Sequence, residues 1–181
     1  MYELFILGEL MDGALHGYLL REIINLAIGP VRQMSWGGLY PLLKRLETDG
    51  LIEQTADPEA SGDRPRKLYR ITARGQERFS FLMLRPDELG ADYFDIFNTK
   101  MLNFDHLTPE QRADCITEYK EYLQFIHKQL LKSKQFVANE QHIAEAEKLW
   151  IKRCQDHRIH MILADLEWIE SLEVELKNES P

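Results

Sequence analysis

The sequence predicts a mainly α-helical protein in which three helices and a β-hairpin precede a longer, purely helical part. Three observations support this class. Apolar residues recur at steps of three and four over most of the chain, which is the spacing of one buried helical face. Two short segments rich in β-branched and aromatic residues, 51–56 and 67–72, flank a loop-forming stretch. From residue 87 onward the spacing indicates helices only.

Length and composition limit the class of protein. The 181 residues, 44% hydrophobic and 29% charged, are enough for one globular domain or two small ones. No apolar run approaches the roughly 20 residues needed to cross a bilayer, and no basic segment leads into a cleavable signal, so a cytoplasmic protein is expected. Cys115 and Cys154 are too few for a disulfide framework and are expected to be reduced.

Charge is unevenly distributed along the chain. The net charge of −8 disfavours a nucleic-acid partner at first sight. Residues 1–78, however, hold 10 Lys or Arg against 11 Asp or Glu, whereas the remainder holds 12 against 19. Within the first part, residues 64–78 carry six basic side chains and one acidic side chain, Glu77. Because local charge steers binding to phosphates, this basic cluster is more informative than the global sum.

Two helices are predicted before residue 31. The first should span residues 2–12 and end at Gly13. The second should span about residues 15–28 and end at Gly29-Pro30, a strong stop signal. The apolar spacing assigns one inward face to each helix: Leu4, Leu7 and Met11 in the first, and Leu19, Ile23 and Leu26 in the second.

The stretch SWGGLYPLLKRLETDGLIEQ (35–54) predicts a third helix with an unusual beginning. Ser35 can cap its N-terminus, and Gly50 suits a left-handed residue after its C-terminus. Leucines recur three and four apart on its expected buried face, at positions 39, 42, 43 and 46. The opening turns nevertheless hold three of the poorest helix formers, Gly37, Gly38 and Pro41.

After the third helix the spacing of apolar residues is no longer helical, and the sequence predicts a β-hairpin. LIEQTA (51–56) and KLYRIT (67–72) predict two strands, and the stretch between them has the Pro, Gly, Asp and Ser of a loop. Thr72 is expected to cap a fourth helix, Ala73 to about Leu84, which ends before Pro86.

The last part of the chain predicts a short helix and two long ones. An aromatic helix is expected around DYFDIFNTKMLN (92–103). Thr108-Pro109-Glu110-Gln111 forms a capping box with proline at the first helical position. The helix that it opens has a heptad-like seam: Ile116, Tyr119, Leu123, Ile126 and Leu130. A last helix, about 140–176, repeats the pattern with Ile151, Ile162, Leu166, Ile169, Leu172 and Leu176.

Three helices followed by a β-hairpin is the order of a winged helix-turn-helix, whose second motif helix enters the major groove with its N-terminal turns leading. Here that helix is the third one. Gly37 and Gly38, which lack side chains, are interpreted as letting backbone N–H groups approach phosphate. Pro41 removes a donor and loosens the first turn. The face away from the leucines carries Tyr40, Lys44 and Arg45, for which an ordinary solvated surface is the alternative.

Three blocks of the sequence resemble the PadR family of bacterial transcriptional regulators: HGYLL (16–20), GGLYPLLKRLETDGLIE (37–53) and RKLYRITARGQE (66–77). They occur in order and at the family's spacing, and they cover about the first 80 residues. The remainder resembles the family's larger C-terminal helical domain, which is known for dimerisation. The resemblance implies a homodimeric repressor that binds a palindromic operator and releases it when a small effector binds.

The resemblance also assigns residues to DNA. The recognition helix, the wing and the HGY block together give the expected DNA-binding set: Tyr18, Ser35, Trp36, Gly37, Gly38, Tyr40, Lys44, Arg45, Arg64, Arg66 and Lys67. Many relatives have Pro-Gly-Thr where this chain has Trp36-Gly37-Gly38. This departure removes a hydroxyl and adds a bulky ring, so the operator sequence of a relative does not transfer.

The expected organisation has three parts. A winged helix-turn-helix DNA-binding domain spans 1–84, a connecting segment with a short helix spans 85–107, and a C-terminal helical dimerisation domain spans 108–181. The expected partners are double-stranded operator DNA, a second copy of the chain, and a small effector of aromatic or hydrophobic character whose binding residues are open. No cofactor, metal or membrane is expected.

Several residues have two interpretations. Cys154, His157 and His160 lie three apart on one helix. They either bind a metal ion together or are ordinary interface and surface residues. A set of aromatic residues either lines an effector pocket or packs in the core and the dimer interface: Tyr93, Phe94, Phe97, Phe104, Trp150 and Trp168.

No nucleotide-binding loop, serine elbow or HExxH motif is present, so no enzyme is expected. The alternative function is a winged-helix module for protein–protein interaction without DNA binding.

Overall fold

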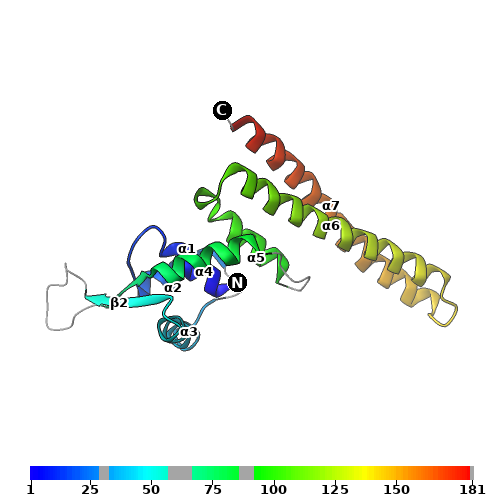
Figure 1. Ribbon diagram of the computed structural model, residues 1–181. Coiled ribbons are helices and arrows are strands. Elements are labelled where there is room, and N and C mark those ends of the chain that lie inside the picture. The colour runs from blue at the N-terminus through cyan, green and yellow to red at the C-terminus, as the bar shows by residue number, and fades with distance from the viewer. Residues whose placement is uncertain (29–32, 57–66, 86–91, 180–181) are drawn as a thin grey trace. The chain divides into compact units, whose positions relative to one another are not determined.

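The structure is a computed structural model of the chain, and it describes residues 1–28, 33–56, 67–85 and 92–179. The chain forms two compact units, Met1–Asp105 and His106–Pro181. None of the helices in these described ranges is long and apolar enough to span a membrane. The mainly helical fold class is confirmed (Figure 1).

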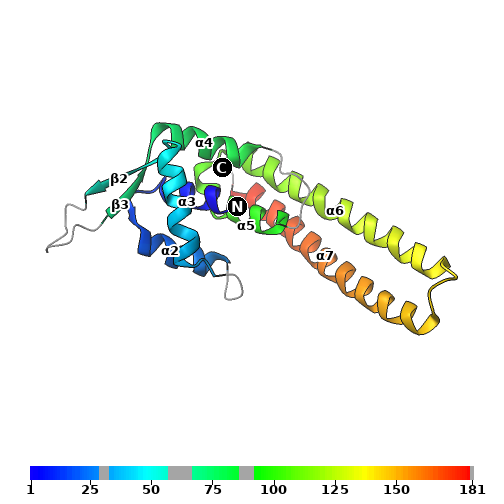
Figure 2. The ribbon, with the colours of Figure 1, turned by 90° about the horizontal axis from the view of Figure 1, so that it is seen from below.

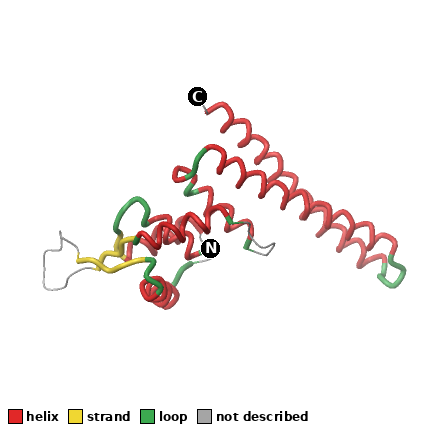
Figure 3. The backbone as a smooth tube through the Cα atoms, viewed as in Figure 1, coloured by secondary structure: helices red, strands yellow, loops and turns green. Residues whose placement is uncertain are grey.

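The first unit combines helices with a small antiparallel sheet. Its elements are α1 (Tyr2–Glu9), β1 (Leu15–His16), α2 (Gly17–Ile28), α3 (Trp36–Thr48), β2 (Ile52–Ala56), β3 (Lys67–Ile71), α4 (Ala73–Leu84) and α5 (Tyr93–Met101), followed by a short 3-10 helix (Phe104–His106). The strands, yellow in Figure 3, have the order β1-β3-β2. β2 and β3 pair from Ile52 opposite Ile71 to Ala56 opposite Lys67, which confirms the predicted hairpin. Its loop, 57–66, lies outside the described residues.

The core of the first unit is built around α1. Five consecutive residues of this helix are buried: Leu4, Phe5, Ile6, Leu7 and Gly8. α1 contacts α2, α4 and α5, so it is covered on nearly all sides. Leu4 and Leu7 are buried as predicted, but the burial is not confined to their face, and Met11 lies beyond the end of the helix at Glu9.

The face that α2 turns inward also differs from the prediction. Leu20 and Ile24 are fully buried, whereas Leu19 is 39% exposed and Leu26 is 83% exposed. Both sets of residues have helical spacing, and spacing alone does not choose between two overlapping apolar stripes. The contacts that α2 makes with α1, α3 and the sheet select Leu20 and Ile24.

β1 was not predicted, and it shortens the second helix. Leu15 and His16 pair with Tyr69 and Leu68 of β3, so α2 begins at Gly17 and not at Leu15. A two-residue strand shows no period in the sequence, and it becomes a strand only because β3 lies beside it.

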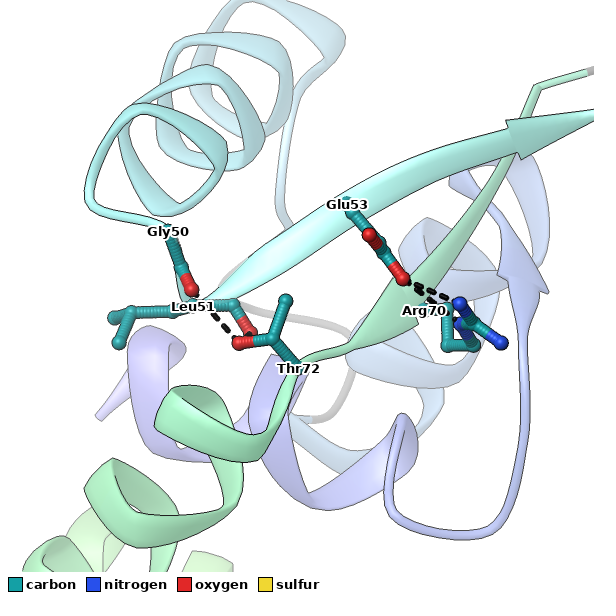
Figure 4. Close-up of polar contacts among 5 residues, drawn as sticks. All are labelled: Gly50, Leu51, Glu53, Arg70 and Thr72. Atoms are coloured by element: carbon teal, nitrogen blue, oxygen red, sulfur yellow. Dashed lines mark hydrogen bonds and ion pairs between the residues drawn. The ribbon is translucent and has the colours of Figure 1, made fainter.

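Polar contacts fix the ends of α3 and α4. Gly50 has φ +69°, the left-handed conformation predicted for it. The Thr72 side chain accepts a 3.0 Å hydrogen bond from the N–H of Gly75, which confirms Thr72 as the cap of α4. Across the hairpin, Arg70 Nε donates to Glu53 Oε1 at 3.0 Å (Figure 4).

The second unit is a hairpin of two long helices, α6 (Pro109–Asn139) and α7 (Glu145–Glu179), which lie side by side in Figures 1 and 2. The predicted capping box is confirmed, because Thr108 and Gln111 exchange side-chain-to-backbone hydrogen bonds. α7 begins at Glu145, later than the predicted 140, since a short turn without Gly or Pro separates the helices. The buried residues of this unit are Leu107, Cys115, Ile116, Tyr119, Leu123, Gln155 and Ile169.

Candidate nucleic-acid interface

α3 divides its residues between a buried face and an exposed face. Its buried face consists of Leu39, Leu43 and Leu46, which anchor the helix in the first unit. The side opposite these leucines exposes Gly37, Tyr40, Pro41, Lys44 and Thr48. Gly37 and Pro41 lie one turn apart on this face, so Tyr40 is the large side chain of its leading half.

Ser35 caps the N-terminus of α3 as predicted. Its Oγ accepts a 3.2 Å hydrogen bond from the N–H of Gly38, and its backbone has the extended conformation of an N-cap residue. The Gly38 N–H also lies 3.1 Å from the Ser35 carbonyl oxygen. The Gly38 donor is therefore engaged inside the cap, so of the two glycines Gly37 is the better source of an N–H for an anion.

The two glycines differ in what surrounds them. A Cβ at Gly38 would lie 3.0 Å from Met34 Sδ, a tight contact that explains a glycine at this position by packing. A Cβ at Gly37 would meet only Ser35 Oγ, at 3.8 Å, which is ordinary contact. Packing inside the described part of the first unit therefore does not require a glycine at position 37.

Three exposed aromatic rings form a column at the start of α3, and we call Tyr18, Trp36 and Tyr40 the aromatic column. The Trp36 ring stacks on Tyr40 with centroids 5.5 Å apart and on Tyr18 with centroids 6.2 Å apart. The guanidinium carbon of Arg21 lies 4.8 Å from the Trp36 ring centroid, a cation–π contact. The column joins the beginning of α2 to the first two turns of α3.

The turn before α3 is tied to α2 by two hydrogen bonds. Arg21 Nε donates to the Met34 carbonyl oxygen at 2.9 Å, and the Met34 N–H donates to Asn25 Oδ1 at 2.6 Å. Arg21 and Asn25 were not predicted from the sequence, because their contacts join residues nine or more positions apart without a regular spacing. These bonds hold the leading end of α3 in one orientation.

The cations of α3 lie in exposed ion pairs. Lys44 Nζ is 3.0 Å from Glu47 Oε2, and the Lys44 side chain is 74% exposed. Arg45 Nη2 lies 3.5 Å from Glu3 Oε2, while Arg78 Nε donates to the other Glu3 oxygen at 2.7 Å. Lys44 therefore lies on the outward face, whereas Arg45 lies on the side nearer α1. Because exposed ion pairs contribute about 0–1 kcal/mol, either cation can exchange its carboxylate for a phosphate at little cost.

A groove lies beside the column at the base of the wing. It has a volume of about 570 Å³ and is lined by His16, Gly17, Tyr18, Leu19, Tyr40, Lys67 and Tyr69. His16 Nδ1 lies 3.2 Å from the Lys67 carbonyl oxygen, so the HGY block and the first residue of β3 meet here. The Lys67 ammonium beside this groove suits a phosphate group, whereas the Tyr18 hydroxyl already donates to the Glu22 carboxylate. Arg64 and Arg66, the other predicted wing residues, lie outside the described residues.

The remaining candidate residues occupy varied environments. Tyr93 and Phe97 are buried in the first unit, and Phe97 contacts Phe104 edge to face at 6.4 Å. Three other predicted aromatics are exposed, Phe94 on α5 and Trp150 and Trp168 on α7. The residues considered for a metal, Cys154, His157 and His160, are all exposed along α7.

Comparison with known proteins finds one family model that is similar to the first part of the chain. Residues 6–80 match the model of the transcriptional regulator PadR-like family. Curated protein sequences gave no match.

Several solved structures are similar to the chain. Bacillus subtilis PadR in complex with operator DNA is 19% identical, with 96% of each chain covered and a TM-score of 0.44. Bacillus subtilis PadR in complex with p-coumaric acid is 19% identical, with 97% of this chain and 98% of that chain covered and a TM-score of 0.41. A PadR family transcription regulator from Clostridium difficile is 24% identical over 44% of this chain and 80% of that chain, with a TM-score of 0.39. The resemblance seen in the sequence is confirmed over residues 6–80, which match the model of the transcriptional regulator PadR-like family.

Proposed function

We propose that this chain is a cytoplasmic, homodimeric repressor that binds operator DNA through α3 and the wing and releases it when a small effector binds. The observation that carries the proposal is the exposed face of α3. Three of its four leucines are buried, with Leu42 half-buried, while Gly37, Tyr40 and Lys44 are exposed on the other side. In helix-turn-helix proteins this end of the second motif helix meets the base edges of the major groove.

Phosphate contacts and base contacts are assigned to different parts of this surface. Lys67, at the groove beside the column, and the basic residues Arg64 and Arg66 position the protein on the DNA backbone. The Gly37 N–H donates to a phosphate at the positive end of α3. Base edges are read by the outward side chains of α3, which include Tyr40 and Lys44.

A second copy of the chain is the proposed partner of the second unit. α6 and α7 expose many large apolar side chains along their length: Phe125, Leu131, Phe136, Leu149, Trp150, Met161, Leu163, Trp168 and Val174. Exposed apolar surface of this extent is typical of a protein–protein interface. A twofold dimer would present two α3 helices, which must reach major-groove faces about 34 Å apart.

The effector is proposed to be a small aromatic or hydrophobic molecule. It would act by binding one arrangement of the dimer better than another, which shifts the population away from the DNA-binding spacing. No covalent step is needed, so no catalytic activity is proposed.

Two measurements test this function. Light scattering of the purified chain is expected to give twice the mass of one 21.3 kDa copy. Selection from a random duplex library is expected to enrich a palindromic sequence, and its affinity should fall steeply with salt. A dimer that enriches no sequence and shows no salt-dependent DNA binding would favour a protein-interaction module instead.

A further inference from the structure

The aromatic column is an unusual surface for this unit. The first unit buries most of its large apolar residues, yet Tyr18 is 59% exposed, Trp36 38% and Tyr40 52%. The three rings stack at interplanar angles of 22° and 27° and so form one exposed aromatic surface, beside which the Tyr18 hydroxyl donates to the Glu22 carboxylate. A contiguous exposed apolar surface of this kind indicates a binding partner.

The column is also held in place before any partner arrives. Trp36 stacks with both tyrosine rings, and the Arg21 guanidinium lies over the indole. Arg21 is itself fixed by its hydrogen bond to the Met34 carbonyl oxygen. A side chain that is already ordered loses little conformational entropy on binding, so its contacts contribute more fully to affinity.

The first turn of α3 offers few other means of reading a base. Gly37 and Gly38 have no side chains, and the Ser35 hydroxyl is engaged with the Gly38 N–H. Trp36 therefore supplies most of the side-chain surface at this end of the helix. In the major groove the apolar feature that distinguishes one base from the others is the C5-methyl group of thymine.

We infer that Trp36, supported by Tyr40, reads thymine methyl groups in the major groove and is a specificity-determining residue. The inference rests on the proposed DNA-binding function and adds the chemical feature that the first turn of α3 recognises. Operators should therefore contain thymine at the positions that face the first turn of α3.

The experiment uses the duplex that the full-length protein selects. Thymine is replaced by uracil at one symmetry-related pair of sites at a time, and the affinity of the protein for each substituted duplex is compared with its affinity for the original. Uracil lacks only the C5-methyl group. The wild-type affinity is expected to fall about fourfold for each methyl that Trp36 covers, the change expected for burying one methyl-sized group. Uracil outside the contacted sites should have no effect.

Protein variants assign the effect to the ring. Trp36→Ala should bind the thymine duplex more weakly and lose the difference between thymine and uracil, and Trp36→Phe should restore part of it. Phe81→Ala is the matched control, because Phe81 is 55% exposed in the same unit and lies 5.4 Å below the Arg78 guanidinium. This control should retain the full difference.

The outcomes separate the inference from the function on which it rests. Equal wild-type affinity for thymine and uracil duplexes, or a full difference retained by Trp36→Ala, would overturn the inference and leave DNA binding intact. Absence of binding to any duplex would instead overturn the proposed function. Because the wild-type comparison needs no mutation, the inference is tested even if Trp36→Ala does not fold.

Discussion

The Thr72 hydroxyl donates a 2.7 Å hydrogen bond to the carbonyl oxygen of Gly50, and this contact joins the start of α4 to the end of α3 (Figure 4). Thr72 Oγ1 also accepts a hydrogen bond from the N–H of Gly75, so this one hydroxyl contacts both helix ends. Because α3 is the proposed recognition helix, Thr72 helps to set its position relative to the hairpin.

Replacing Thr72 by Val is expected to lower the free energy of unfolding by about 2 kcal/mol, roughly half from the lost cap and half from the lost bond to Gly50. Urea unfolding followed by circular dichroism measures the change. Thr72→Ser keeps the hydroxyl and should stay close to wild type. Equal midpoints for the two variants would show that the hydroxyl contributes nothing.

Gly37→Ala is expected to separate stability from DNA binding. A Cβ at position 37 meets only Ser35 Oγ, at 3.8 Å, and alanine is about 0.5–1 kcal/mol better than glycine inside a helix. The folded protein should therefore become more stable. Its DNA affinity should fall, because the added methyl group faces the bound duplex.

Gly75→Ala is the contrasting substitution at another helical glycine. A Cβ there would lie 2.1 Å from the Leu51 carbonyl oxygen, so overpacking should destabilise the fold by at least about 1–3 kcal/mol. Thermal melting and DNA titration of both variants give the comparison. Unchanged or tighter DNA binding by Gly37→Ala would argue against close approach of DNA at this position.

The wing is expected to contribute salt-dependent affinity without sequence preference. Changing Arg64, Arg66 and Lys67 together to Ala should weaken binding to all duplexes. It should also reduce the slope of log affinity against log salt by up to roughly 2.7, since each phosphate contact contributes about 0.9. A matched triple variant of exposed lysines in the second unit, Lys128, Lys132 and Lys177, should leave the slope unchanged. An unchanged slope in the wing variant would remove the wing from the mechanism.

Asp165 is expected to make the second unit less stable at neutral pH. Burial raises the pKa of this carboxyl above its ordinary value, and burial together with Asp165 raises the pKa of Tyr119. The folded chain therefore holds the Asp165 proton more tightly than the unfolded chain does. Stability should fall as pH rises from the unfolded to the folded pKa of Asp165, and it should stay lower above that range.

Asp165→Asn removes this pH dependence, so the variant should be more stable than wild type at pH 7. The difference should shrink as pH falls below about 4, where the carboxyl is protonated in both states. Urea midpoints measured across this range provide the test, with the exposed Glu175→Gln as control. A variant less stable than wild type at pH 7 would mean that the charged carboxylate makes a favourable contact.

The local signals in the sequence were sufficient to place most elements of the fold. Ser35, Thr72 and Thr108 cap the helices that they were predicted to cap, and Gly50 has the left-handed conformation expected of it. The hairpin also pairs as predicted. Caps, turns and hairpins depend on residues a few positions apart, so their physical cause is contained in a short stretch of chain.

Tertiary contacts decided the features that join distant residues. The inward face of α2 is Leu20 and Ile24 because those side chains meet the rest of the core, although Leu19 and Leu26 have equally good spacing. β1 exists because β3 lies beside it.

The exposed residues at the start of α3 were identified from the sequence, but their arrangement was not. Trp36 stacks with Tyr18 only because the chain folds α2 against α3, and Arg45 comes within 3.5 Å of Glu3 only in the folded unit. The sequence by itself determined the capping residues of α3, α4 and α6, the pairing of β2 with β3, and which residues the recognition helix carries. The tertiary structure alone decided which faces are buried and which rings touch, because such contacts depend on the packing of segments that are far apart along the chain.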